Sequence, residues 1–167
     1  IVDENLTTLS EIRMDHRAGI ETARILLAFG NDFFIFANRM VCVSNEQKMH
    51  HSEVSHGDKM RELGMAYYRG RDGVLRVVSD HVHKFFVCDN LPLEPVREAL
   101  QKVPGIDLTQ SSATNIEVMP LGVDKGKGVE NLAKLLGIPM SQVMTLGDEG
   151  NDVSMLRAAG YGVAMGN

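Results

Sequence analysis

The sequence has few cysteines and no long apolar run. Its two cysteines, Cys42 and Cys88, are not in a CxxC spacing. They therefore predict free thiols in a reducing compartment such as the cytoplasm, and they exclude a disulfide framework. No apolar run approaches the roughly 18 residues that a membrane-spanning helix needs. The first residues, IVDENLTTLS, carry acids and no basic segment, which is not typical of a signal peptide. We expect a cytoplasmic protein with no membrane partner.

An excess of positive charge is also absent. The 167 residues carry a formal net charge of −5. Proteins that bind nucleic-acid phosphates instead have clusters of Lys and Arg. We therefore expect no nucleic-acid partner. Hydrophobic residues make up 44% and charged residues 23% of the chain, a composition typical of a packed globular core. The length predicts one ordinary domain or two small ones.

Residues 1–119 predict an α+β domain with mostly antiparallel strand pairing. A probable hairpin turns at Ala37-Asn38-Arg39. The patterns favour helices over 17–29 and 93–103, with a further helix suggested over 59–68, and strands over 33–36, 40–43, 73–80, 81–89, 106–111 and 114–120. The rest of 46–66 is polar and His-rich, and its pattern predicts no single element.

After Pro120 the pattern becomes helix, strand, helix, strand, over 125–137, 142–147, 151–160 and 161–165. This order predicts a parallel α/β unit over 120–167. The strand QVMTLG is almost continuously apolar, which is typical of a strand buried on both faces of a parallel sheet. The fold class is therefore α/β.

Asp148, Asn151 and Asp152 follow that strand directly. Ligands of open parallel sheets collect outside the carboxyl ends of the strands. Two nearby carboxylates repel each other, and a hard cation such as Mg²⁺, which takes oxygen ligands, would relieve the repulsion. The alternative is that Asp152 or Asn151 only caps the following helix.

Lys125 opens its helix, where a cation opposes the helix dipole. A residue placed against local electrostatics indicates a role elsewhere, and an ammonium at this end of the sheet would neutralise a phosphate or a reacting carboxylate. The alternative is a solvated surface lysine. The run GVDKGKG is not a P-loop, because it lacks the required spacing.

The segments VDKGKGV, GDEGND and MLRAAGYGVAMGN resemble the C-terminal half of haloacid dehalogenase superfamily phosphatases, most closely the Cof-type branch. The segments HKFFVCD, LEPVREAL and TNIEVMP, in that order, are similar to the inserted cap of that branch. The resemblance implies an α+β cap over 1–119 and the C-terminal part of a Rossmann-like core, with its parallel sheet, over 120–167.

The resemblance also implies a Mg²⁺-dependent phosphatase that hydrolyses small, sugar-phosphate-like monoesters through an aspartyl-phosphate intermediate. Lys125 would stabilise the nucleophile and the phosphoryl group, and Asp148 would bind Mg²⁺ directly. Asp152 would support the metal site from outside, and Asn151 would contact the substrate phosphate or the water shell of the metal. The partner would be a small phosphorylated metabolite, whose leaving group the cap selects.

The sequence departs from the family in one respect. The DxDGT segment that carries the family's nucleophile is absent, and Asp3-Glu4-Asn5 does not replace it. We therefore expect a cap plus part of a core, truncated at both ends and inactive alone. An incomplete parallel sheet exposes apolar faces, which predicts a homo-oligomer formed through the incomplete core.

Two other functions stay open. A phosphorylation-domain fragment of a P-type ATPase carries a similar GDxxND loop, although the lack of membrane segments and the cap-like order argue against it. A non-catalytic binding or regulatory module derived from a phosphatase is supported by the missing nucleophile.

The histidines do not predict a zinc site. His81 and His83 would share one face of a strand, and His50, His51 and His56 precede them, but no third ligand has a recognisable spacing. Lining of the cap's substrate face or exposure to solvent is the preferred interpretation.

Overall fold

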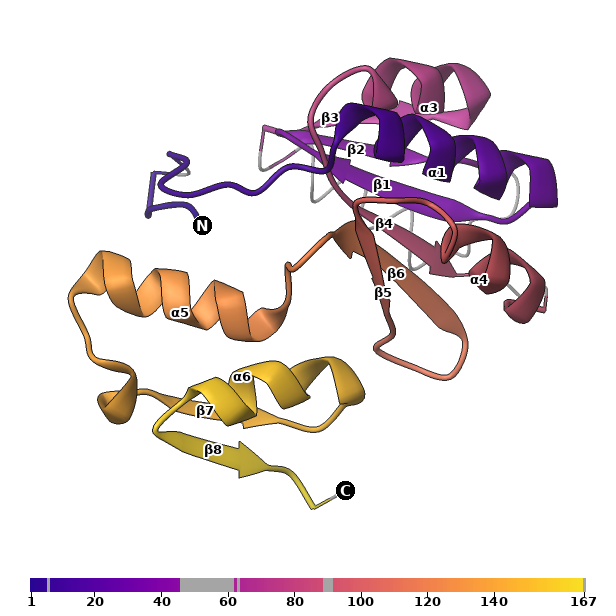
Figure 1. Cartoon of the computed structure of the whole chain (residues 1–167). Coiled ribbons are helices and arrows are strands. Elements are labelled where there is room, and N and C mark those ends of the chain that lie inside the picture. Colours follow the sequence, from indigo (N-terminus) through magenta and orange to yellow (C-terminus); the bar gives the residue numbers. More distant parts are fainter. Residues whose placement is uncertain (6, 46–61, 63, 89–91, 167) are drawn as a thin grey trace. The chain divides into compact units, whose positions relative to one another are not determined.

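The computed structural model describes residues 1–5, 7–45, 62, 64–88 and 92–166, and the chain divides into two compact units (Figure 1). The first unit comprises Ile1–Ile12, Gln110–Ser112 and Gly122–Asn167, and the second comprises Arg13–Thr109 and Ala113–Leu121. The sequence placed residues 1–12 in the domain over 1–119, whereas they group with the C-terminal residues because they are not part of the helix-and-sheet core of the second unit.

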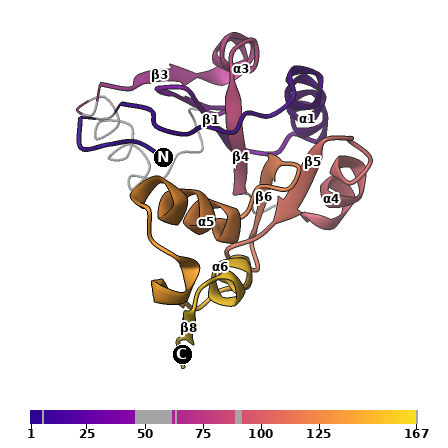
Figure 2. The same ribbon diagram turned by 60° about the vertical axis from the view of Figure 1, so that its left-hand side comes forward.

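The first unit contains a pair of parallel strands joined by a helix. Its elements are α5 (Lys125–Leu136), η1 (Met140–Gln142), β7 (Met144–Gly147), η2 (Gly150–Asp152), α6 (Val153–Ala158) and β8 (Tyr161–Ala164). β7 and β8 pair in parallel, with Leu146 opposite Val163. α6 contacts α5 on one side and the strands β7 and β8 on the other (Figure 1, Figure 2). The predicted order of helix, strand, helix, strand is therefore confirmed.

Both ends of α5 follow from local chemistry. The Asp124 side chain accepts a 2.8 Å hydrogen bond from the backbone N–H of Lys127, which satisfies a donor that a helix start leaves unpaired. Gly137 ends the helix with φ of 69°, a left-handed conformation that a glycine adopts without a Cβ penalty. The predicted C-terminal glycine is confirmed.

The predicted burial of the 142–147 strand on both faces is wrong for the described residues. Thr145 faces α6, since its hydroxyl donates a 3.1 Å hydrogen bond to the Met155 carbonyl, and it is buried. Met144 and Leu146 lie on the other face and are 61% and 57% exposed. α6 packs against only one face of β7. The apolar side chains on the other face of β7 are not covered by the described residues.

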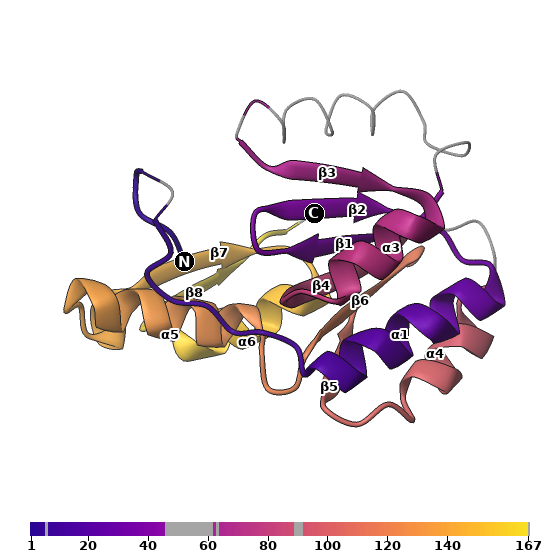
Figure 3. The same ribbon diagram turned by 90° about the horizontal axis from the view of Figure 1, so that it is seen from above.

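In the second unit, the described residues form a six-stranded sheet with the order β3-β2-β1-β4-β6-β5. β2 and β3 are parallel, and the other neighbours are antiparallel. α1, α3 and α4 contribute buried side chains to the core on one face of this sheet (Figure 3). The elements are α1 (His16–Phe29), β1 (Phe33–Ala37), β2 (Met40–Val43), β3 (Ala66–Arg69), α3 (Gly70–Val78), β4 (Val82–Cys88), α4 (Glu94–Leu100), β5 (Ile106–Thr109) and β6 (Asn115–Pro120).

Strand alternation separates the two faces of this sheet. Phe33 and Ile35 of β1 and Phe85 of β4 are at most 1% exposed and pack with Leu26 of α1. Full burial of such side chains stabilises the fold by roughly 1.5–3 kcal/mol each. The predicted hairpin is confirmed, with Ala37 opposite Met40.

Two predictions in the second unit are wrong. Residues 73–80 were expected to form a strand, but α3 covers Gly70–Val78, with Val74, Val77 and Val78 buried. Their spacing of three and four residues lines one face of a helix, so packing overrode the β-propensity of valine. The helix suggested over 59–68 falls partly outside the described residues, and Ala66–Arg69 forms β3.

Among the described residues, no helix combines the length and the apolar character that crossing a membrane requires.

The close approach of α5 to α6 depends on Gly126, and this can be tested. A Cβ at Gly126 would lie 2.8 Å from the backbone oxygen of Ser154, whereas a Cβ at Gly128 would meet nothing within 4 Å. We expect Gly126→Ala to lower the free energy of unfolding by about 1–3 kcal/mol because the backbone must shift. The matched control Gly128→Ala should raise it by about 0.5–1 kcal/mol through helix propensity. Urea unfolding followed by circular dichroism measures both, and equal effects would contradict the close packing.

Candidate functional site

The candidate site begins where β7 ends. The chain turns sharply after Gly147 into η2, and the Asp152 side chain folds back against the end of the strand. A Cβ at Gly147 would lie 2.8 Å from Cγ of Asp152, which is too close for any other residue. Glycine at this position therefore permits the placement of Asp152.

Asp152 is the centre of a hydrogen-bond network at this turn. It is 4% exposed. Its Oδ2 accepts from the backbone N–H groups of Asp148, at 3.1 Å, and Glu149, at 3.2 Å, and its Oδ1 accepts from the ammonium of Lys125. The hydrogen bond from Lys125, followed by those from the two backbone donors, lowers the pKa of Asp152 from 3.8 to about 2. The carboxylate is therefore ionised at neutral pH.

Capping is only one of the contacts of Asp152. Glu149 and Asp152 form a reciprocal capping box around η2, a spacing that the sequence shows and that the sequence analysis missed. The ion pair with Lys125 comes in addition. The interpretation of Asp152 as a cap alone is therefore wrong.

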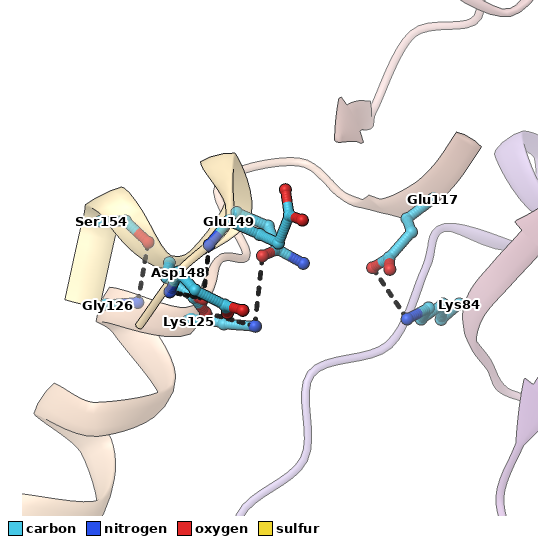
Figure 4. Close-up of polar contacts among 9 residues, drawn as sticks. Lys84, Glu117, Lys125, Gly126, Asp148, Glu149 and Ser154 are labelled. Carbon is cyan, nitrogen blue, oxygen red and sulfur yellow. Dashed lines mark hydrogen bonds and ion pairs between the residues drawn. The ribbon is translucent and has the colours of Figure 1, made fainter. Parts of the chain in front are cut away.

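Lys125 reaches this network from the first residue of α5. Its Nζ donates to Asp152 and, at 3.2 Å, to Oδ1 of Asn151 (Figure 4). The side chain is 48% exposed, so one part of it contacts solvent while the ammonium is held. The alternative of a solvated surface lysine is wrong, because a carboxylate and an amide from the 148–152 loop bind this ammonium.

The contact with Lys125 fixes the orientation of the Asn151 amide. An ammonium only donates hydrogen bonds, so the amide oxygen must face it. The Nδ2 end of Asn151 therefore remains a donor for another acceptor. Donors of this kind suit an anionic oxygen.

A second hydrogen bond ties the two helices together beside the site. The backbone N–H of Gly126 donates to Oγ of Ser154 at 3.0 Å (Figure 4). Ser154 could not be predicted from the sequence, since a serine in a short helix carries no signal of its own. Together with Lys125, this contact holds the start of α5 against the 148–152 loop.

The carboxylates fit a Mg²⁺ site with few protein ligands. Both oxygens of Asp152 already accept hydrogen bonds, so its role is to hold the loop and the lysine. Asp148, at the strand end, is the residue that would hold a cation, as the sequence predicts. Within the described part of the chain, no group of three or more His, Cys, Asp and Glu side chains is arranged for a metal. Mg²⁺ is often bound by one or two carboxylates, with water and substrate oxygens completing its shell.

The histidines provide no zinc cluster within the same described ranges. His81 lies 2.9 Å from a carboxylate oxygen of Asp80. His50, His51 and His56 lie outside the described residues.

The ion pair predicts a measurable pKa. In magnesium-free buffer, a ¹³C NMR titration of the Asp152 carboxyl should give a pKa of about 2. Lys125→Met should raise this pKa towards 3.8 without reaching it, because the two backbone donors remain. The pKa of Asp152 is lower in the folded protein than in the unfolded chain. The ionised carboxylate therefore stabilises the fold above pH 3.8, and this stabilisation is lost as the pH falls towards 2. The control is Lys127→Met, which breaks the 2.8 Å pair with Glu130. A similar shift of the Asp152 pKa in both variants would show that Lys125 is not what lowers it.

Comparisons with known proteins find relatives that are named as phosphatases. A family model described as haloacid dehalogenase-like hydrolase matches residues 1–167. The chain is 46% identical over 72 residues to the 5-amino-6-(5-phospho-D-ribitylamino)uracil phosphatase YcsE of Bacillus subtilis, a match that covers 43% of this chain and 29% of that protein. It is 26% identical over 197 residues to a phosphoglycolate phosphatase of Methanoculleus marisnigri, covering all of this chain and 83% of that protein.

Solved structures show the same fold. A haloacid dehalogenase-like hydrolase from Bacteroides thetaiotaomicron matches 98% of this chain with a TM-score of 0.75 and 23% identity. A haloacid dehalogenase-like hydrolase from B. subtilis matches 99% of it with a TM-score of 0.76 and 18% identity. The chain spans 60% and 65% of these two structures. The match to the family model over residues 1–167 shows that the chain belongs to the haloacid dehalogenase-like hydrolases.

Proposed function

We propose that this chain supplies the cation-binding and phosphate-binding part of a Mg²⁺-dependent phosphatase that acts on small phosphate monoesters. The observation that carries the proposal is the ammonium of Lys125, which Asp152 and Asn151 hold next to the strand end that bears Asp148. A cation site and a fixed ammonium at one strand end suit a doubly charged phosphate.

Each residue of the site has a distinct task in this proposal. Asp148 would hold Mg²⁺, which would supply charge neutralisation for the transferring phosphoryl group. Lys125 places a second positive charge beside the phosphate oxygens and the attacking carboxylate. Asn151 donates a hydrogen bond from Nδ2 to a phosphate oxygen. Asp152 positions Lys125 and the loop, and its low pKa keeps it ionised while it does so.

The attacking group is not within the printed sequence, which contains no DxDGT segment. In the proposed reaction, an aspartate oxygen bonds to phosphorus while the ester P–O bond breaks and the alcohol leaves. Water then cleaves the aspartyl-phosphate and releases phosphate. We propose that this chemistry belongs to the whole protein and that the 167 residues alone do not turn over.

The remaining assignments are part of the same proposal. Relatives named as phosphatases of a phosphoribitylamino-uracil and of phosphoglycolate support a small phosphorylated metabolite as the substrate. The second unit would serve as a cap that selects the leaving group. The thiols of Cys42 and Cys88 support a cytoplasmic location.

A non-catalytic binding module is the second candidate, and the missing nucleophile segment is the observation that favours it. It would keep the phosphate-binding groups without hydrolysis. No contact in the described residues favours a P-type ATPase fragment.

The two candidates are separated by restoring a DxDGT-bearing segment ahead of the chain and measuring phosphate release from a panel of phosphoesters. We expect release that depends on Mg²⁺ and is lost in Asp148→Asn. Asp152→Asn should weaken Mg²⁺ affinity by about 10–100-fold, as for groups that orient ligands. Glu130→Gln, which changes the α5 carboxylate that pairs with Lys127, should have no effect. An inactive restored protein together with unchanged Mg²⁺ binding by Asp148→Asn would overturn the enzymatic proposal.

We also propose that the chain forms a homo-oligomer through the apolar residues that the first unit exposes, among them Met144, Leu146, Tyr161 and Val163. Light scattering should then give a mass above 18.4 kDa. Leu146→Glu should shift the mass towards that of the monomer, whereas Leu75→Glu on α3, where Leu75 is also exposed, should not. A monodisperse wild-type monomer would contradict the proposal.

A further inference from the structure

The first turn of α5 is held from two sides. The N–H groups in the first turn of a helix have no partners inside the helix. Asp124, which caps α5, accepts from the backbone N–H of Lys127 at 2.8 Å. The backbone N–H of Gly126 instead donates to the Ser154 hydroxyl of α6, at 3.0 Å. One donor of α5 is therefore satisfied by its own cap, and another by the neighbouring helix.

Gly126 meets Ser154 at two points. In addition to the hydrogen bond to Oγ, a Cβ at Gly126 would lie 2.8 Å from the backbone oxygen of the same serine. Both contacts involve the backbone of α5 and no flexible side chain of that helix. The start of α5 is therefore fixed relative to Ser154 more firmly than a contact between two long side chains would fix it, because such side chains have many rotamers.

The residue before Gly126 is Lys125, whose ammonium donates to Asp152. Consecutive Cα atoms are only about 3.8 Å apart, so the place of Gly126 determines where the lysine side chain begins. Asp152 precedes Ser154 by two residues. Two adjacent residues of α5 are thus held by two nearby residues of one loop and helix, the first through its side chain and the second through its backbone.

The ion pair by itself is a weak way to place the ammonium. The side chain of Lys125 is 48% exposed, and ion pairs of exposed lysines contribute little because ordering the long side chain offsets the attraction. A backbone that is already in place lowers this cost, since the side chain then needs only a rotamer that reaches Asp152. Support by hydrogen bonds from outside the site is how functional groups are held in position.

We propose that Ser154 is a positioning residue, whose hydroxyl accepts from Gly126 and thereby sets the place of the Lys125 ammonium at the end of β7. Ser154 acts through the backbone of α5 and not on a substrate. That the positioned ammonium meets a phosphate oxygen rests on the proposed function, whereas the positioning itself does not.

Two substitutions of Ser154 separate this role from the stability of α6. Alanine lacks the acceptor but has the highest helix propensity of all residues. Threonine keeps the hydroxyl, although its branched side chain is less favourable in a helix. Helix propensity and the place of the ammonium should therefore rank Ser154→Ala and Ser154→Thr in opposite orders.

The test follows the Lys125 ammonium by NMR in the full chain labelled with ¹³C and ¹⁵N. The wild type should show a coupling between Lys125 ¹⁵Nζ and Asp152 ¹³Cγ, which passes through their hydrogen bond. Ser154→Ala should abolish this coupling and speed the exchange of the ammonium protons with water by about 2- to 10-fold, the loss expected for one hydrogen bond. Ser154→Thr should retain the coupling. Circular dichroism establishes that each variant is folded.

The control is Thr145→Val, which removes a different tether of the same helix. The Thr145 hydroxyl donates to the Met155 carbonyl at 3.1 Å, so this contact ties α6 to β7 and not to α5. Thr145→Val should retain the coupling. A wild type without the coupling, an unchanged coupling in folded Ser154→Ala, or a loss in Ser154→Thr or Thr145→Val would overturn the proposal.

Inorganic phosphate and Mg²⁺ separate this inference from the proposed function. In calorimetric titrations of the full chain, Ser154→Ala should lower the affinity for phosphate in the presence of Mg²⁺ by about 2- to 10-fold. The affinity for Mg²⁺ should stay unchanged, because Asp148 and Asp152 remain. An equal loss of both affinities would show that the variant disrupts the whole site, and would overturn the positioning role. If the coupling changes as expected but the wild type binds no phosphate, the proposed function fails and the positioning role stands.

Discussion

The ion pair between Lys125 and Asp152 is the contact on which the rest of the site depends. Lys125 lies at the first residue of α5, where the helix dipole disfavours a cation. Asp152 offsets this cost, because its carboxylate is ionised and almost fully removed from solvent. The same carboxylate accepts from the backbone of Asp148 and Glu149. One side chain thus joins a helix start, a strand end and the loop that follows it.

Close backbone approach makes this contact possible. Gly126 brings α5 against the carbonyl of Ser154, and Gly147 leaves room for the side chain of Asp152. Gly162 similarly lets β8 approach the backbone of α6 at Leu156. A side chain at any of these positions would push the elements apart. These glycines therefore strengthen the ion pair between Lys125 and Asp152, because the attraction between an ammonium and a carboxylate falls with distance.

Strand alternation gives the two faces of the sheet in the second unit different side chains. One face of its sheet holds an apolar core with three helices, and this face accounts for the fully buried side chains such as Phe33 and Phe85. The other face carries phenyl rings and the pair formed by Lys84 and Glu117. Because adjacent residues of one strand point to opposite faces, the same segment supplies the apolar core on one side and a partly exposed polar and aromatic surface on the other.

The sequence alone determined the elements with strong local signals. Helical spacing and the C-terminal glycine defined α5, the turn at residues 37–39 defined the hairpin, and the acids after Leu146 marked the site. Tertiary structure decided α3, because the valines at 74, 77 and 78 favour either helix or strand until a sheet surface packs against one side of them. It also decided that Asp152 serves Lys125 and the backbone together, and that Lys84 meets Glu117. These partners are 27 and 33 residues apart, and no local pattern encodes contacts that form only when distant segments fold onto each other.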